Sequence, residues 1–236
     1  MPGWFIKVLQ VVVALALPLV LLMGNVQLLM HERFVHYEYG KASFPPDTAV
    51  PVGGYRLSRA ERAALAEKAL ESIVGSRGLR VLEEARFQET GAPAFHAREI
   101  RHMRDVRRVF ERARLLFWVA LVALVGGGVM LAWRGKGRQT LTQPLLVSVV
   151  VTLSLAAGLG LFIVANFSSF FTEFHHVFFE GDTWLFHRDD TLIRLFPTDF
   201  WFDAAVIIAG LTVVELLLVG GGAWWWGRKV VNADKR

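Results

Sequence analysis

The chain has 236 residues, of which 54% are hydrophobic and only 20% are charged. A soluble domain of this length is more polar on average, so the composition indicates a membrane protein. The chain has no cysteine, which excludes disulfides, thiolate zinc sites and cysteine nucleophiles. The net charge of +5 lies where an anionic lipid surface attracts it, and we therefore predict no nucleic-acid partner.

Four long hydrophobic runs predict four transmembrane helices in an all-α fold. The runs cover residues 5–30, 115–133, 144–171 and 204–226, and the only charged residues in them are one lysine and one glutamate. A helix rises about 1.5 Å per residue, so about 20 residues cross a hydrocarbon core of about 30 Å. The first run has no small-residue cleavage site after it, and we interpret it as a retained anchor.

The predicted organisation is an integral membrane protein with one sizeable polar domain. Its parts in chain order are a first transmembrane helix at 1–30, an extracytoplasmic, mainly helical cap at 31–114, a second transmembrane helix at 115–133, a cytoplasmic loop at 134–143, a third transmembrane helix at 144–171, an extracytoplasmic loop at 172–203, a fourth transmembrane helix at 204–226 and a cytoplasmic tail at 227–236.

The orientation follows from the basic residues of the short segments. Those on the side of the two termini carry Lys7, Arg134, Lys136, Arg138, Arg228, Lys229, Lys235 and Arg236, opposed only by Asp234. The segment 172–203 has two arginines against seven acids. The positive-inside rule therefore places both termini in the cytoplasm. The cap holds an arginine-rich stretch, but long domains are translocated largely regardless of charge.

Turn and helix signals divide the cap. Residues 44–54 contain Pro45, Pro46 and Pro51 and end in Val52-Gly53-Gly54, and they predict a loop. Ser58-x-x-Glu61 is a capping box that predicts a helix over 62–74, closed by Gly75. A further helix over 97–114 is expected to run into the second span.

All seven histidines lie in segments assigned to the outer side, so we expect the active zone where the cap meets the bilayer. In the helix 97–114, Glu99 and His102 lie on the apolar face, three residues apart and able to touch. A carboxylate beside an imidazole holds the ring in one tautomer and raises its basicity. The alternative is a structural core histidine. Asp105 lies on the flank of this helix, and an arginine row lies opposite.

The second candidate is an aromatic segment after the third span. If the helix continues, Phe167, Phe170, Phe171, Phe174 and Phe178 form one stripe, with His175 at its border and His176 pointing away. The alternative is interfacial packing of aromatic residues. Burial of His175 would favour its neutral form, which is the form able to accept a proton.

Glu215 lies in mid-span, where a carboxylate is rare. It lies roughly 16 Å from the outer end of its helix, too far to serve the predicted active zone. We therefore expect a protonated glutamic acid bonded to Thr152, Ser154 or an amide of the first span.

Other kinds of site have weaker support. Ser168 and Ser169 stand near His175, but the sequence has no G-x-S-x-G elbow, no H-E-x-x-H and no phosphate loop. His102, His175 and Glu99 have ligand chemistry acceptable for zinc, without a dense spacing motif. We predict no metal and no cofactor.

Two sequence blocks resemble the bacterial lipoprotein intramolecular transacylases. The first is Glu99-x-x-His102-Met103-x-Asp105-Val106. The second is Phe174-His175-x-x-Phe178-Phe179-x-x-Asp182-x-Trp184, followed by Asp190-x-Leu192-Ile193-x-x-Phe196-Pro197-x-x-Phe200-Trp201-x-Asp203. The likeness runs over most of the chain, but only these blocks are specific.

The resemblance implies a multi-pass enzyme of the bacterial plasma membrane whose partners are membrane lipids and a diacylglyceryl lipoprotein. The sn-2 acyl chain of this substrate would move to the α-amino group of its own N-terminal cysteine, giving the lyso form. The two family histidines match His102 and His175, and the same blocks supply the supporting residues Glu99, Asp105, Phe174 and Trp184.

The substrate's amine is the nucleophile in such a reaction, so no serine or cysteine nucleophile is needed. We expect His102, oriented by Glu99, to act as base and His175 as acid or oxyanion donor, or the reverse. The alternatives are a non-enzymatic lipid-binding or accessory membrane protein and a membrane metallohydrolase.

Overall fold

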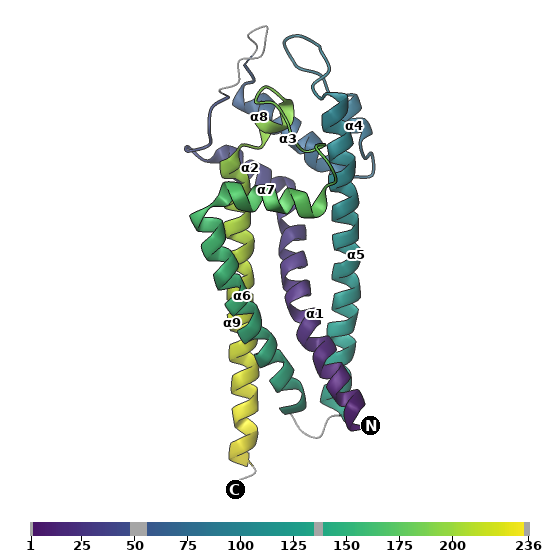
Figure 1. Ribbon diagram of the computed structural model, residues 1–236, viewed down its shortest axis with the longest axis vertical. Coiled ribbons are helices and arrows are strands. Elements are labelled where there is room, and N and C mark those ends of the chain that lie inside the picture. The colour runs from purple at the N-terminus through teal and green to yellow at the C-terminus, as the bar shows by residue number, and fades with distance from the viewer. Residues whose placement is uncertain (1, 48–55, 135–138, 234–236) are drawn as a thin grey trace. The chain divides into compact units, whose positions relative to one another are not determined.

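The described part of the computed structural model, residues 2–47, 56–134 and 139–233, consists of helices joined by turns and loops and has no strand (Figure 1). Side chains are not described for 134 and 229–233. Four helices are long and apolar enough to cross a membrane, namely α1 (Gly3–Leu29), α5 (Ala97–Arg134), α6 (Gln139–Ala165) and α9 (Thr198–Ala233). The prediction of an all-α fold with four such helices is confirmed.

The chain forms two compact units. Unit 1 comprises residues 1–27, 113–165 and 206–236, and unit 2 comprises residues 28–112 and 166–205. The predicted cap and the predicted outer loop at 172–203 therefore belong to the same unit. Because seven arginines precede residue 115 in α5, we treat only the apolar part from residue 115 onward as spanning the membrane.

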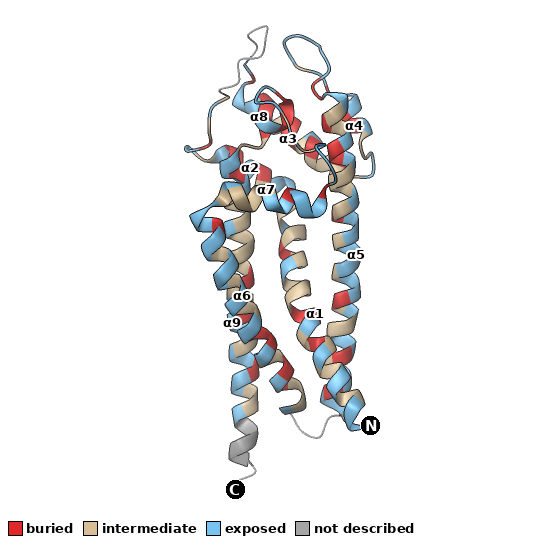
Figure 2. Ribbon diagram, viewed as in Figure 1, coloured by how far each residue is buried: buried red, intermediate tan, exposed pale blue. Residues whose placement is uncertain are grey.

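Unit 1 is a helical bundle with close helix contacts. A Cβ atom on Gly127 of α5 would lie 2.9 Å from Cγ2 of Val13 in α1, and one on Gly220 of α9 would lie 3.1 Å from Cγ1 of Val149 in α6. Small residues let membrane helices approach each other closely. In the most apolar 18 residues of each long helix only 17% are buried. Figure 2 shows mostly exposed and intermediate residues along these helices. The remaining apolar surface suits contact with lipid.

The mid-span carboxylate of Glu215 is hydrogen-bonded within unit 1. Asn25 Nδ2 of α1 donates to Glu215 Oε2 at 2.9 Å and to Thr212 Oγ1 at 3.0 Å. The predicted partner from the first span is therefore confirmed. Ser154, another predicted partner, instead donates to the carbonyl of Val150. Protonation of this carboxyl group stays a prediction.

Unit 2 contains the short helices and the first half of α5. They are α2 (Glu32–Gly40), α3 (Arg59–Val74), α4 (Arg80–Glu83), α7 (Phe167–Phe178) and α8 (Thr191–Leu195). The predicted cap of α3 is present, because Ser58 Oγ accepts from the Glu61 backbone N–H at 3.1 Å. Glu61 Oε1 accepts from the backbone N–H of Gln88. The predicted Val52-Gly53-Gly54 turn lies outside the described residues.

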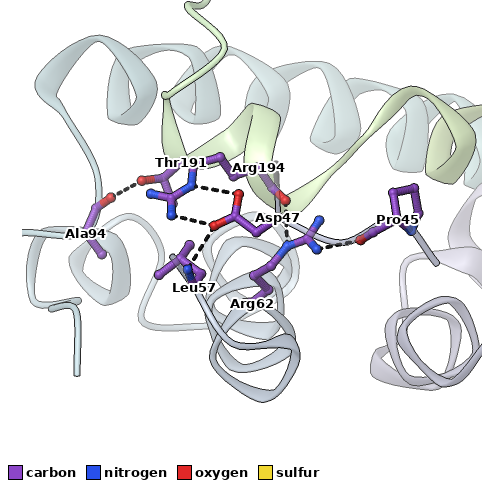
Figure 3. A network of polar contacts seen from close by, with 7 residues as sticks. All are labelled: Pro45, Asp47, Leu57, Arg62, Ala94, Thr191 and Arg194. Carbon is purple, nitrogen blue, oxygen red and sulfur yellow. Dashed lines mark hydrogen bonds and ion pairs between the residues drawn. The ribbon is translucent and has the colours of Figure 1, made fainter. Parts of the chain in front are cut away.

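A buried polar network joins the two chain segments of unit 2 (Figure 3). Arg194 Nη2 donates to Asp47 Oδ2 at 2.6 Å, and both side chains are only 3% exposed. The same Oδ2 accepts from the backbone N–H of Leu57. Arg62 donates to the carbonyls of Arg194 and Pro45 at 2.8 and 2.7 Å. Buried charges are tolerated only when paired in this way, so the network fixes one segment against the other.

The Asp47 carboxylate is held in its charged form. Burial alone would raise the pKa of Asp47, but the hydrogen bond from Arg194, the Leu57 N–H and the nearby guanidinium charges outweigh it and hold the pKa below its ordinary value. Its ion pair with Arg194 therefore persists at neutral pH.

The third long helix ends earlier than predicted. The sequence predicted one helix to residue 171, but α6 ends at Ala165 and α7 begins at Phe167. Between them Asn166 has a non-helical φ of −154°, and its side chain accepts from the Ser169 N–H at 3.1 Å. Asparagine is among the preferred N-caps, which explains why a new helix starts here.

Candidate active site

The first half of α5 places His102 in the interior of unit 2. Met103 and Phe110 on the same face are buried, whereas Arg101 and Arg104 on the other side are exposed, as the periodicity predicted. His102 is only 8% exposed. Amphipathic periodicity alone therefore located this histidine correctly.

Helix α7 places His175 beside a continuous row of aromatic rings. Phe167 contacts Phe170, Phe170 contacts Phe174 and Phe174 contacts Phe178, with centroids 5.9, 6.3 and 4.7 Å apart. The predicted stripe is confirmed, although α7 is a separate helix. His175 is buried, while Phe174 and Phe178 are 42% and 47% exposed. The helix therefore has a buried histidine on one side and exposed aromatic rings on another.

The two predicted histidines come together in unit 2. The rings of His102 and His175 are nearly parallel, 19° apart, with centroids separated by 6.2 Å. Phe179 packs against both rings, at 4.9 Å from His102 and 5.4 Å from His175. Phe186 covers His102 at 5.3 Å, and Trp184 covers His175 at 4.9 Å. The aromatic rings therefore pack around the pair, and both histidines are buried.

Burial distinguishes this pair from the other histidines. All seven histidines lie within the described residues, and among them only His102 and His175 are buried. The neighbouring His176 is 57% exposed and lies 3.9 Å from Glu173, so it points away as predicted. His36 is likewise exposed and lies 3.5 Å from Glu67.

A backbone contact fixes the tautomer of His175. Its Nδ1 lies 2.7 Å from the carbonyl oxygen of Phe171. A carbonyl only accepts, so Nδ1 carries the proton and the neutral ring has a free lone pair on Nε2. Burial lowers the pKa of His175 below its ordinary value, the nearby His176 acts in the same direction, and the bond to Phe171 opposes them. The ring is therefore neutral and basic at Nε2 near neutral pH.

His102 has no such orienting partner. Its Nδ1 is buried, and no group in the described ranges hydrogen-bonds to it. Nor does any serine hydroxyl among the described residues hydrogen-bond to either histidine, so Ser168 and Ser169 gain no support as nucleophiles.

The predicted Glu99–His102 pair is wrong. Glu99 is fully buried, but its Oε2 accepts from the backbone N–H of His96 and its Oε1 from that of Leu192, both at 2.7 Å. Spacing along one helix could place Glu99 near His102. It could not show that the backbone N–H of Leu192, distant in sequence, would donate to the Glu99 carboxylate. Glu99 therefore joins the start of α5 to the start of α8.

The remaining predicted residues differ in their relation to the pair. Trp184 and Phe174 both pack against the His175 ring, the latter at 5.6 Å. Asp105 instead forms a surface ion pair with Arg108 at 2.9 Å. Phe179 and Phe186, which sequence reasoning did not single out, are the rings closest to His102, and Phe179 was visible only as part of the second sequence block.

A cluster with metal-ligand chemistry lies near α8 but is already hydrogen-bonded. His96, Glu99 and Asp190 have potential ligand atoms within 4.8 Å of one another. Both oxygens of Glu99 accept backbone N–H groups, as described above. Asp190 accepts from Arg98 and from the backbone N–H of His187. The carboxylate oxygens of Glu99 and Asp190 are therefore already used in hydrogen bonds within unit 2. The zinc ligands considered from the sequence, His102, His175 and Glu99, do not form such a cluster among the described residues.

Comparison with known proteins identifies relatives over most of the chain. Residues 11–201 match the family model described as lipoprotein intramolecular transacylase Lit. A protein of Aquifex aeolicus without an assigned function is 28% identical over 212 residues, which is 87% of this chain and 88% of that protein. The structure of the membrane integral lipoprotein intramolecular transacylase Lit from Bacillus cereus has a TM-score of 0.67 at 17% identity and covers 99% of both chains. A variant of it with one histidine replaced by arginine has a TM-score of 0.56 at 16% identity, covering 98% of this chain and 96% of that one.

Proposed function

Because the chain belongs to the lipoprotein intramolecular transacylase family, it is a membrane-integral acyltransferase, and we propose that it moves the sn-2 acyl chain of a diacylglyceryl lipoprotein to the α-amino group of the same lipoprotein's N-terminal cysteine. The product is the lyso-form lipoprotein. The observation that carries this proposal is the buried, nearly parallel pair of His102 and His175, one of which has its tautomer fixed.

The reaction needs proton transfer but no protein nucleophile. One histidine removes a proton from the substrate's α-ammonium group, and the free amine attacks the carbonyl carbon of the sn-2 ester. The tetrahedral intermediate then expels the glyceryl oxygen, which the other histidine protonates. An N–C bond forms and the ester C–O bond breaks. On going from ammonium to amide the nitrogen loses two protons, the first to the base before the attack and the second to the other histidine after it. That histidine passes the second proton to the glyceryl oxygen, and the base releases the first proton to solvent, so the protons balance.

The tautomer argument assigns the base to His175. Its Nε2 is free to accept because Nδ1 donates to Phe171, and such a fixed orientation is typical of a catalytic base. Burial lowers the pKa of His102 to about 4, so this ring is neutral before the reaction; it accepts the second proton of the attacking nitrogen and passes it to the leaving oxygen. This reverses the assignment that the sequence favoured, because Glu99 does not orient His102.

The aromatic surroundings suit a lipid substrate. Phe179 covers both histidines and Phe186 covers His102, and exposed rings such as Phe174 and Phe178 on α7 offer apolar surface to acyl chains. Exclusion of water matters because water would otherwise hydrolyse the ester instead of the amine attacking it.

The orientation belongs to the same proposal. We propose that both termini lie in the cytoplasm and that unit 2 faces the outside of the bacterial plasma membrane. The first turns of α1 and the last turns of α9 lie at the same end of unit 1 (Figure 1). The excess of lysine and arginine in the flanks of that end supports a cytoplasmic location.

Mass spectrometry of the lipoprotein N-terminus tests this function. Purified protein is incubated with a diacylglyceryl lipopeptide, and the product is fragmented to locate each acyl chain. We expect an N-acyl, monoacylglyceryl cysteine of unchanged total mass. Unchanged substrate would favour an accessory or lipid-binding role, and free fatty acid would indicate a hydrolase.

A further inference from the structure

Unpaired polar atoms gather on the rings around His175. Across the described residues only three buried side-chain polar atoms lack a hydrogen-bond partner, namely Nδ1 of His102, Nε1 of Trp184 and Oε1 of Glu38. The first two lie on rings that pack beside His175, with centroids 6.2 and 4.9 Å from it. Buried polar groups are nearly always paired, so two exceptions at one place indicate where a polar group of a ligand binds.

We propose that the Nε1–H of Trp184 donates a hydrogen bond to the carbonyl oxygen of the reacting ester and holds the oxyanion that forms there. The inference rests on the proposed acyl transfer and adds the donor that this reaction still needs, since both histidines are assigned to proton transfer. An indole nitrogen donates and never accepts. It therefore suits an oxygen that gains negative charge and takes no part in the proton movements.

The position of Trp184 is well defined. Its ring packs against both adjacent histidines of α7, at 4.9 Å and 37° from His175 and at 5.2 Å and 73° from His176. The turn that carries it includes Gly181, whose φ of +62° suits glycine. A donor fixed before the reaction stabilises developing charge without reorganisation, which is how such donors contribute to rate.

The same turn borders an open space. Its residues Asp182, Thr183 and Leu185 line a cavity of about 340 Å³ together with Arg98 and Arg101 of α5. Polar atoms of a substrate therefore have room next to the segment that holds Trp184.

The variant Trp184→Phe tests the donor, because it keeps an aromatic ring and removes the N–H. We expect kcat to fall about 10²–10³-fold with little change in KM, as for loss of one oxyanion donor. The matched control is Trp201→Phe in the same unit. Trp201 is 41% exposed and packs against Phe171, Phe196 and Phe200; among the ring contacts of the described residues it has none with either paired histidine. This control should keep its kcat.

Two unreactive substrate analogues identify the atom that is bound. One has an amide in place of the sn-2 ester and keeps the carbonyl, and the other has an ether and lacks it. The wild-type protein and Trp201→Phe should bind the amide about 2–10-fold more tightly than the ether, as expected for one neutral hydrogen bond. Trp184→Phe should bind the two equally.

The outcomes separate this inference from the proposed function. If the wild-type protein forms the lyso product and Trp184→Phe keeps its kcat or its preference for the amide, the donor role is wrong while the acyl transfer stands. If the wild-type protein forms no lyso product, the acyl transfer itself is wrong. Should Trp184→Phe fail to fold, the indole N–H Raman band of the wild-type protein decides. A shift with the amide and not with the ether supports the donor, and no shift overturns it.

Discussion

Replacement of His175 by alanine is the sharpest test of the proposed mechanism. The change removes the imidazole whose tautomer the Phe171 carbonyl fixes, so the base at Nε2 is lost. A positioned general base contributes about 10²–10⁴-fold to a rate, which corresponds to about 2.7–5.4 kcal/mol in the activation free energy. We expect a loss in kcat of this size in a lipopeptide assay followed by mass spectrometry.

The structure also predicts what His175→Ala does to stability. The Phe171 carbonyl keeps its helical backbone bond, so no buried acceptor is left unpaired, and the cost is the loss of ring contacts with residues such as Trp184. We expect a decrease of about 0.5–3 kcal/mol in the free energy of unfolding, small enough for the protein to remain folded in detergent.

Two comparisons complete this test. His176→Ala, at the exposed neighbour, should keep its activity. The double variant His102→Ala with His175→Ala should be little slower than either single variant, because residues that act as one unit are not additive. The reasoning is refuted if His175→Ala keeps more than about a tenth of the wild-type kcat. It is also refuted if its activity loss is matched by unfolding at the assay temperature.

Four further outcomes are expected. Glu99→Gln should lower the free energy of unfolding by about 1–3 kcal/mol in a thermal or chemical melt, because one of two buried backbone N–H groups loses its acceptor; lost activity with an unchanged melt would contradict this. Asp47→Asn should cost about 3–5 kcal/mol of stability at pH 7. The pKa of Asp47 is lowered in the folded protein, so its contribution to the free energy of unfolding is complete above the unfolded pKa of about 3.9 and is lost as pH falls through the folded pKa. If Asp47→Asn cost the same stability at about pH 2 as at about pH 7, this ion-pair reasoning would be wrong. Because the pKa of His175 is lowered, the base stays neutral at pH values somewhat below about 6.5, the ordinary pKa of histidine. We therefore expect kcat to stay level through about pH 6.5 and to fall only at lower pH. A midpoint of the pH profile at or above about pH 6.5 would exclude His175 as the base. Reporter fusions at Gln139 and at the C-terminus should register as cytoplasmic and one at Gly53 as external, and an external signal at Gln139 would reverse the proposed orientation.

The sequence by itself determined the features that depend on local patterns. Four hydrophobic runs of sufficient length predicted four helices that can cross a membrane, because spanning requires about 20 consecutive apolar residues and little else. Helical periodicity placed His102 and Glu99 on the buried face of α5, and the same reasoning predicted the aromatic stripe next to His175. The mid-span Glu215 found a first-span amide because an unpaired carboxyl group in an apolar environment is costly.

Only the tertiary structure decided how distant residues pair. Asp47 and Arg194 are 147 residues apart, and nothing in their local sequence shows that they are buried together. Glu99 accepts from Leu192, 93 residues away, and so leaves His102 without the orienting partner that spacing predicted. The tautomer of His175 and the burial of the Trp184 nitrogen likewise depend on ring and backbone positions in three dimensions. The physical reason is that hydrophobic periodicity reports which face of a helix is buried, whereas hydrogen bonds act over about 3 Å and depend on where other segments bring their donors.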